Sequence, residues 1–304
     1  MSGSRSIDRI LVTGSSNTDL VCLTDRLPRP GETVASTSFA VYPGGKAANQ
    51  AVAAARSGAN VVFAGCFGDD DYGRDRYAEL EAEGIDLTYS RVIEGETSGL
   101  ALIAVDSAGE NIIITVGGAN ERISVEQLRE AFRDREYDVV LLPNEAPPDV
   151  VREIVTSAGA ATVVLNAAPF ASYLSEIAGS VDVLVCNEVE ASQFLGRDVK
   201  IGAAQEAVIE LAGLAGGGAV ITLGAAGAVG SLDGDVLEVP ALDVKVVDTT
   251  GAGDAFCGAF AAWLASGRGF DEALQAGVVA GSLAATRAGA QPSLPRYEEI
   301  VSRL

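Results

Sequence analysis

The stretch VVDTTGAGDAFCGAF, residues 246–260, places acidic and hydroxylic residues before a Gly-Ala-Gly turn, and an aspartate, Asp254, where a helix is predicted to begin. The first amide groups of a helix have no intrahelical partner, and the helix dipole adds partial positive charge there. A turn of such small residues leaves these amides open to a phosphate oxygen. Asp254 would then lie beside the phosphate and accept a proton from a nearby hydroxyl, as phosphoryl transfer requires. An aspartate that merely caps the helix is the structural alternative, and this stretch alone does not separate the two.

Six runs of mostly continuous apolar residues predict strands buried on both faces, as in a parallel sheet. They are RILVTGSSN (9–17), NVVFAGCFGDD (60–70), DVVLLPNE (138–145), ATVVLNAAP (161–169), VDVLVCNE (181–188) and GAVITLGAAG (218–227). Segments of helical character occur at 47–57, 75–83, 125–133, 148–158, 205–215, 254–266 and 270–287. This alternation predicts an α/β fold, with one doubly wound, mostly parallel sheet flanked by helices in a single domain over residues 1–304.

Two regions, residues 18–43 and 97–117, interrupt this rhythm, because their residues alternate as in exposed antiparallel strands. The second region contains a hairpin turn around residues 107–110. We expect the two regions to form a small β-sheet that projects from the main domain as a lid or a dimer surface. An ordinary edge hairpin is the alternative interpretation.

Polar residues gather where the predicted strands end, which is where open parallel sheets bind ligands. These residues are Asn17, Asp69, Asn144, Glu145, Asn166, Asn187 and Thr222. Asn and Asp also form turns, so the coincidence over six strands, and no single residue, favours a cleft. The segment YPGGKAANQ (42–50) adds a Gly-Gly pair that permits close backbone approach, together with donors at Lys46 and Asn49. It is not a P-loop, because Ala40 and Ala47 stand where that motif needs Gly and Ser or Thr.

The residue inventory excludes several kinds of chemistry. The chain has no histidine, which removes serine–histidine and cysteine–histidine nucleophile pairs and imidazole metal sites. Its 4 cysteines show no C-x-x-C spacing, so a structural zinc site is not expected. The formal net charge of −21 repels phosphate backbones, which argues against nucleic acid as a partner. Any general base is therefore an Asp, Glu, Lys, Tyr or Cys.

The same inventory bears on the location of the protein. No apolar run approaches the roughly 20 residues that cross a bilayer, and the segment MSGSRSIDRI (1–10) lacks the apolar core of a signal peptide. We therefore expect a cytoplasmic protein that does not enter membranes. The acidic excess, with lysine only at Lys46, Lys200 and Lys245, suggests a halophilic protein in a cytosol of very high salt.

The segments around Lys46 and Asp254 resemble the paired signatures of the ribokinase family of sugar kinases, the phosphofructokinase-B type carbohydrate kinases. The resemblance extends over nearly the whole chain. It includes NTDL (17–20), RPGETV (29–34), GDDDYG (68–73), NAAP (166–169), NEVEAS (187–192), ITLGAAG (221–227) and TRAGAQPSLP (286–295). It implies a ribokinase-like fold and an ATP-dependent kinase that converts D-ribose to D-ribose 5-phosphate.

The resemblance also implies a role for individual residues. Asp254 would be the general base, and Gly251, Ala252 and Gly253 would form the anion hole. The sugar would be held by Asn17, Asp19, Gly45, Lys46, Asn49 and Glu145. Asn187 and Glu190 would order Mg²⁺ and its waters, while Thr222, Gly224, Gly227 and Gly253 would border the nucleotide. A monovalent cation, K⁺, would be held by Asp248, Thr250, Ala284, Arg287, Gly289 and Ser293. The projecting sheet would close over the sugar and join two chains into a homodimer.

Several alternatives stay open at this point. Another sugar or a nucleoside, such as fructose, 2-keto-3-deoxygluconate or adenosine, is compatible with the same motifs, and so is a non-catalytic sugar-binding protein on the same scaffold. Two departures from the family pattern bear on specificity. Ala47 replaces a common glycine, so its methyl group either crowds the sugar or stabilises the helix start. The segment LLPNEAPP around Glu145 also differs from the usual form.

Overall fold

The computed structural model describes residues 9–304. The first eight residues, which make up most of the segment tested for a signal peptide, lie outside the described residues. The described chain is built on an eight-stranded sheet. Its strands run in the order β14 (Asp235–Val239), β13 (Ala228–Leu232), β12 (Gly218–Thr222), β11 (Val183–Asn187), β10 (Thr162–Asn166), β9 (Val139–Pro143), β1 (Arg9–Thr13) and β4 (Asn60–Ala64).

The six predicted strands are all present, and they pair in parallel from β4 to β12. Their side chains are almost all buried, as continuous apolar runs require. The sequence-based prediction missed β13 and β14, which extend the sheet in antiparallel fashion. The turn between them, Asp233-Gly234, has positive φ at both residues. An Asp-Gly pair between short apolar runs is a strong hairpin signal, so the sequence did contain the information.

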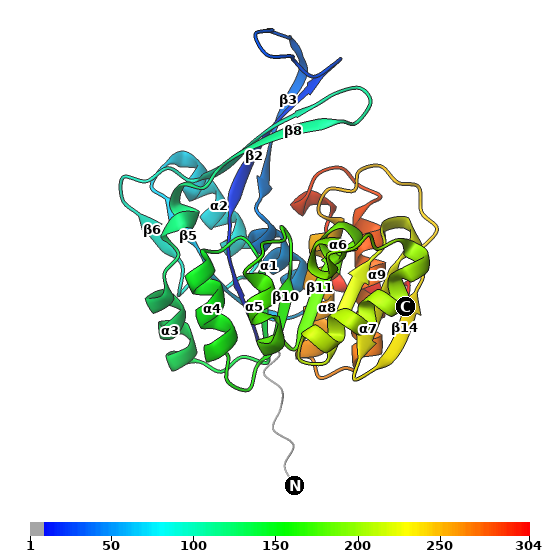
Figure 1. Cartoon of the computed structure of the whole chain (residues 1–304). Coiled ribbons are helices and arrows are strands. Elements are labelled where there is room, and N and C mark those ends of the chain that lie inside the picture. The colour runs from blue at the N-terminus through cyan, green and yellow to red at the C-terminus, as the bar shows by residue number, and fades with distance from the viewer. Residues whose placement is uncertain (1–8) are drawn as a thin grey trace.

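Helices cover both faces of the sheet, which makes the fold doubly wound (Figure 1). On one face lie α1 (Lys46–Arg56), α8 (Ala252–Ala265) and α9 (Phe270–Ala284), and on the other lie α3 (Val125–Asp134), α4 (Pro148–Ser157), α6 (Glu188–Leu195) and α7 (Ala204–Leu214). Along β1, Ile10 and Val12 join the first core and Leu11 joins the second. The remaining elements are α2 (Asp71–Ala82), α5 (Leu174–Ile177), α10 (Tyr297–Val301) and the strand pair β5 (Cys66–Gly68) and β6 (Arg91–Ile93).

A second, four-stranded sheet projects from the main domain, as expected (Figure 1). Its order is β3 (Ser36–Gly44), β2 (Asn17–Thr24), β7 (Gly99–Val105) and β8 (Asn111–Val116). The pairs β2–β3 and β7–β8 are antiparallel hairpins, and the turn between β7 and β8 lies where it was predicted. The central pair, β2–β7, is parallel, because both hairpins leave the main domain in the same direction.

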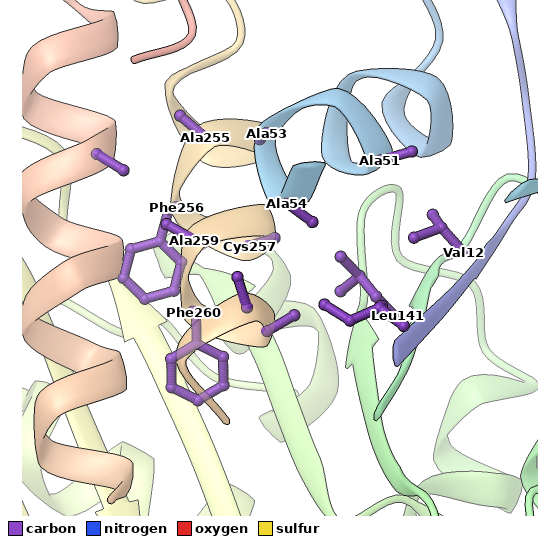
Figure 2. Packing of buried hydrophobic residues seen from close by; sticks show 14 of the residues in the cluster. Val12, Ala51, Ala53, Ala54, Leu141, Ala255, Phe256, Cys257, Ala259 and Phe260 are labelled. Atoms are coloured by element: carbon purple, nitrogen blue, oxygen red, sulfur yellow. The ribbon is translucent and has the colours of Figure 1, made fainter. Parts of the chain in front are cut away.

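Helices α1 and α8 pack directly against each other (Figure 2). A Cβ atom on Gly258 of α8 would lie 2.4 Å from the Cβ of Ala53 and 2.7 Å from the carbonyl oxygen of Gln50, both on α1. Alanines on α1 and the bare backbone at Gly258 permit this approach. On the far side of α8, Phe256 and Phe260 stack with ring centroids 5.9 Å apart. The start of α8 is thereby fixed relative to the start of α1.

Within residues 9–304, no helix is long and apolar enough to cross a membrane.

Candidate active site

A cavity of about 530 Å³ lies at the carboxyl ends of the parallel strands, beneath the projecting sheet. It is lined by every residue predicted to hold the sugar, namely Asn17, Asp19, Gly45, Lys46, Asn49 and Glu145, together with Asp254. Asn187, Glu190 and Thr222 also reach it. The projecting sheet contributes Ala101, Ile103, Ile113 and Thr115 as a wall. Residues far apart in the sequence thus share one cleft, as the strand-end pattern predicted.

Helix α8 begins at Ala252, two residues before its predicted start, so Asp254 is its third residue. Gly251 precedes the helix with φ of 78°, a conformation that favours glycine. The amide of Ala252 donates to the carbonyl oxygen of Thr249 at 3.1 Å, so this member of the predicted anion hole is already engaged. The amides of Gly251, Gly253 and Asp254 find no acceptor in the part of the chain that the structure describes. These are the open donors of the turn.

The carboxylate of Asp254 accepts hydrogen bonds on both oxygens. The Asn49 side-chain amide donates to Oδ2 at 2.9 Å, and the Gln50 side-chain amide donates to Oδ1 at 3.0 Å. Burial raises the pKa of Asp254 to about 6, although these two amides and the Lys46 ammonium lower it. Sequence reasoning missed Gln50, whose only signal was a polar residue inside an Ala-rich helix.

Lys46 and Glu145 form an ion pair at the cavity wall. The Lys46 Nζ lies 3.3 Å from Glu145 Oε1, and the backbone amide of Lys46 donates to Glu145 Oε2 at 2.9 Å. The hydroxyl of Ser15, which was not predicted, also donates to Glu145. Burial alone would lower the pKa of Lys46, but the charges of Glu145 and Asp254 raise it above its usual value. Lys46 is therefore a cation that is paired with Glu145 and further favoured by the charge of Asp254.

The first segment predicted to hold the sugar lies where β1 leads into β2. Burial and the nearby charge of Glu145 raise the pKa of Asp19 to about 6, against the opposing charges of Lys46 and Arg76. A Cβ atom on Gly44 would lie 2.3 Å from both Asp19 carboxylate oxygens, so the Gly-Gly pair makes room for this carboxylate. The side-chain oxygen of Asn17 accepts from the Asn120 amide at 2.8 Å. Asn120 is a second positioning residue that the sequence did not indicate.

Ala47 does not crowd the cavity. Its side chain is fully buried in the core and is absent from the cavity wall. It faces Gly14, where an added Cβ would lie 2.8 Å from the Ala47 Cβ. The methyl group therefore fills space above Gly14 at the start of α1. The geometry does not support the alternative in which it narrows the predicted sugar site.

Asn187 and Glu190 form a reciprocal cap at the start of α6. The Asn187 Oδ1 accepts from the Glu190 amide at 2.9 Å, and Glu190 Oε2 accepts from the Asn187 amide at 2.8 Å. Burial raises the pKa of Glu190, although the Asn187 amide and Lys46 lower it. The sequence did not predict α6, because its eight residues are too short and mixed for a clear periodicity. The cap engages only Oε2 of Glu190; among residues 9–304 no group donates a hydrogen bond to its Oε1, and the residue lines the cavity.

A second cavity of about 490 Å³ adjoins the first, and Thr222 and Gly253 line both. Its wall includes the predicted nucleotide residues Gly224 and Gly227. The rest is largely apolar and comes from the segment before α8 and from α8 and α9: Leu242, Val244, Val246, Phe256, Val278 and Ala285. Two neighbouring cavities that meet at the first turn of α8 are suited to two ligands that react with each other.

The residues predicted to hold K⁺ gather beside that turn, outside the two cavities except for Thr250. The carboxylate of Asp248 accepts from the amide and hydroxyl of Thr250 and, at 2.8 Å, from the Gly289 amide. Burial opposes ionisation, but these bonds lower the pKa of Asp248 below its usual value. The Ser293 hydroxyl donates to the Ala290 carbonyl oxygen, while the Arg287 side chain pairs with Glu299. The Ala284 carbonyl oxygen accepts from the Arg287 amide.

Two of the polar strand-end residues have structural partners and do not line the first cavity. Asp69 accepts from the Gly95 amide at 2.9 Å. The Asn144 side chain donates to the Pro169 carbonyl oxygen and accepts from the Tyr173 hydroxyl. These two residues are the turn formers that the strand-end pattern alone could not separate from ligand-binding residues.

Comparisons with known proteins agree with this geometry. The family model described as pfkB family carbohydrate kinase matches residues 7–296. Ribokinase from Haemophilus influenzae is 35% identical over 302 residues, covering 97% of this chain and 98% of that protein. Deoxyribokinase from Salmonella typhi is 33% identical over 298 residues, covering 95% and 96%. The structure of Arabidopsis thaliana ribokinase complexed with ribose and ATP has a TM-score of 0.87 at 31% identity, covering 96% of this chain and 97% of that one.

Proposed function

We propose that this chain, which belongs to the pfkB family of carbohydrate kinases, transfers the terminal phosphoryl group of ATP to the 5-hydroxyl of D-ribose. The observation that carries the proposal is the single cavity in which Asp254 meets five polar sugar-binding candidates and Gly45, next to a second cavity at the first turn of α8. The product is D-ribose 5-phosphate. The ribose and ATP held by the similar Arabidopsis protein support this pair of substrates.

Asp254 acts as the general base. With a pKa of about 6 it is ionised at neutral pH, and it accepts the hydroxyl proton as the oxygen attacks phosphorus. The open amides of Gly251, Gly253 and Asp254 stabilise negative charge on the transferring group. The amide of Ala252 contributes only after it leaves the Thr249 carbonyl. The reaction needs little beyond this positioning, because the transition state is loose.

The sugar binds through Asn17, Asp19, Gly45, Lys46, Asn49 and Glu145. Asn49 donates to Asp254, and among residues 9–304 its buried Oδ1 has no partner, which leaves an acceptor for a hydroxyl. The Asp19 carboxylate can accept from two neighbouring hydroxyls. Orientation of the sugar by several fixed groups places the 5-hydroxyl beside Asp254.

The nucleotide occupies the second cavity, bordered by Thr222, Gly224, Gly227 and Gly253. From Arg9 to the C-terminus, no three acidic or cysteine side chains converge to hold a metal. Mg²⁺ often binds through phosphates and water with one or two carboxylates, and Glu190, with Asn187 beside it, suits that mode. When bound, the ion neutralises phosphate charge. Glu190 and Asn187 are held ready for it by their reciprocal cap.

We infer a site for a monovalent cation, K⁺, at the loop that precedes α8. The ion would be held by carboxylate, hydroxyl or carbonyl oxygens, a donor set that fits a hard cation. These would come from Asp248, Thr250, Ala284, Arg287, Gly289 and Ser293. Asp248 is tied to Thr250 and Gly289, so a cation there stiffens the loop next to the open amides. Equal rates in K⁺-free and K⁺-containing buffer would exclude this assignment.

The projecting sheet serves as a lid and as the surface of a homodimer. One face carries cavity residues such as Ile113 and Thr115, while the other exposes Phe39, Val41, Leu102, Ile112 and Ile114. An exposed apolar face of this kind is suited to a second copy of the chain. Closure over the sugar excludes water and limits ATP hydrolysis. The protein works in the cytoplasm, in a cytosol of high salt.

A coupled kinase assay over ribose, 2-deoxyribose, fructose, 2-keto-3-deoxygluconate and adenosine tests the substrate. We expect ribose to give the highest kcat/KM. Deoxyribose is the second candidate, favoured by the similar Salmonella protein. Turnover of adenosine above that of both pentoses would overturn the proposal. Binding of ribose with no turnover of any acceptor would indicate a non-catalytic sugar-binding protein.

A further inference from the structure

The geometry points to Gln50 as a positioning residue that fixes the orientation of the Asp254 carboxylate and keeps it ionised. This inference rests on the proposed function, in which Asp254 is the base. Gln50 follows Asn49 on α1 and is completely buried. Unlike Asn49, it does not line the sugar cavity, so it acts on the reaction only through Asp254.

The side chain of Gln50 is locked by a chain of three hydrogen bonds. Its Nε2 donates to Asp254 Oδ1 and to Asn166 Oδ1, both at 3.0 Å. The Nδ2 of Asn166 in turn donates to the Val185 carbonyl oxygen at 3.3 Å, which sets the direction of the Asn166 amide. Since Asn166 presents its oxygen, Gln50 must present its nitrogen, and Asp254 meets an N–H group and not a second oxygen.

The two amides hold Asp254 from different sides. Asn49 binds Oδ2 from the cavity, where a sugar hydroxyl arrives, and Gln50 binds Oδ1 from behind. The carboxylate is therefore fixed in rotation before substrate binds. The close approach of α1 and α8 at Gly258 makes the second contact possible, because the Gln50 backbone itself lies against α8.

The charged groups around Asp254 do little to stabilise its carboxylate, so neutral donors are needed to keep it ionised. Lys46 faces Asp254, but it is paired with Glu145, whose own charge opposes ionisation of Asp254. Glu190 lines the same cavity, and Cys257, one turn further along α8, is a buried thiol whose pKa is raised. Of these groups, only Lys46 favours the ionised form of Asp254. Gln50 and Asn49 supply the remaining stabilisation of the charge that burial disfavours.

The buried oxygen of Gln50 supports the same assignment. Its Oε1 is shielded from solvent and accepts no hydrogen bond from any of residues 9–304. A buried amide that leaves its oxygen unsatisfied is costly to the fold, so a purely structural role would be better served by an apolar side chain. The donor half of the amide, in contrast, is fully used.

The test compares Gln50→Met with Gln127→Met. Methionine keeps the length and approximate volume of glutamine and removes the donor. Gln127 is the matched control, because it is also completely buried and donates through Nε2 to two carbonyl oxygens, those of Gly65 and Tyr89, away from both cavities. The readout is kcat and KM against pH, measured with the best acceptor from the sugar panel.

For Gln50→Met we expect the acid limb of the kcat profile to move up by about one pH unit. The KM for the sugar should change less than about two-fold, since Gln50 does not touch the cavity. Gln127→Met should lower thermal stability without moving the pH profile. An unshifted acid limb in Gln50→Met, or a raised KM with unchanged kcat, would overturn the inference.

A second variant and a second measurement keep the inference testable if Gln50→Met misfolds or if the protein phosphorylates none of the sugars in the panel. Gln50→Glu keeps the shape and places a like charge beside Asp254, so its acid limb should rise by more than that of Gln50→Met. The titration of Asp254 can also be followed by ¹³C NMR of aspartate-labelled protein, with the resonance assigned by its loss in Asp254→Asn. A higher midpoint in either Gln50 variant supports the inference even if no sugar is phosphorylated, and an unchanged midpoint refutes it.

Discussion

Two local effects act on the pKa of Asp254 in opposite directions. Its position in the first turn of α8 and its two amide partners favour the ionised carboxylate, whereas burial favours the neutral acid. The result is a pKa of about 6, close enough to neutrality for efficient proton transfer and low enough for the base to be ionised at pH 7. An aspartate that only capped the helix would not need the Asn49 and Gln50 amides.

Replacement of Asp254 by asparagine should remove catalysis and preserve sugar binding. We expect kcat to fall by about 10³-fold, within the range of general base catalysis, while calorimetry shows a ribose affinity within a few-fold of wild type. Asp69→Asn is the control, since Asp69 also follows a strand but does not line the sugar cavity. Substantial turnover by Asp254→Asn would show that another group takes the proton.

The raised pKa of Asp254 also has a consequence for stability. The folded-state pKa of about 6 lies above the ordinary value of 3.8, so the folded chain holds the proton more tightly than the unfolded chain. The wild type should therefore lose stability relative to Asp254→Asn as the pH rises from about 4 to about 6. We expect a relative loss of about 2 kcal/mol, reduced from the full value because the residue is partly exposed.

Urea unfolding of both proteins at pH 4, 5, 6 and 7 measures this difference. Asp19, whose pKa is also raised to about 6, titrates in both proteins and cancels from the comparison. A difference in unfolding free energy that stays constant from pH 4 to pH 7 would contradict the raised pKa.

At the scale of elements, the site depends on the contact between α1 and α8. One helix carries the candidate sugar-binding residues Lys46 and Asn49, and the other carries Asp254, the candidate base, with the open amides of Gly253 and Asp254 in its first turn. Gly258 sets their separation, because nothing larger than a hydrogen fits between its Cα and α1. Alanine would force the helices apart by displacing Ala53 and the Gln50 backbone.

Gly258→Ala should therefore cost both stability and activity. We expect about 1–3 kcal/mol of destabilisation and a fall in kcat greater than the rise in KM, because Asp254 moves away from its amide partners. Gly213→Ala in α7 is the control, since among residues 9–304 its Cβ position meets no heavy atom within 4 Å beyond its chain neighbours and the backbone of its own helix. That change should be neutral or slightly stabilising. Equal effects of the two substitutions, by urea unfolding and steady-state kinetics, would contradict the packing argument.

The projecting sheet is the second element with a testable role. Ile114 is 58% exposed and lies on the face opposite the cavity. Ile114→Glu should convert a homodimer to a monomer in light scattering, because it places a charge in an apolar interface. Thr88→Glu, which adds the same charge at an exposed position away from the sheet, should leave the oligomeric state unchanged. A wild-type monomer at working concentration would refute the proposed dimer.

At the scale of the whole molecule, the net charge of −21 controls the response to salt. Repulsion among carboxylates is screened as ionic strength rises, so the melting temperature should increase by several degrees from 0.1 to 2 M KCl. Activity should persist in molar salt. A melting temperature in dilute buffer equal to that in 2 M KCl would contradict the halophilic assignment.

Features that leave a local pattern in the sequence could be predicted, whereas features that depend on distant contacts could not. The six parallel strands were predictable because strands buried on both faces are continuously apolar. The cleft was predictable because parallel strands end on one edge. Gln50 and Asn120 were not, since each owes its role to a partner more than 100 residues away. The position of the Ala47 methyl was equally invisible, because it depends on Gly14 from a different strand-to-turn segment.

Asp254 directly follows Gly253, whose amide is open, in the first turn of α8, so the proposed proton acceptor and a proposed oxyanion donor belong to one helix. A small displacement of the surrounding sheet would therefore move both groups together and keep the distance between them unchanged. Movement of the projecting sheet, in its proposed role as a lid, would then change only when a hydroxyl enters the cavity and when a phosphorylated product leaves it.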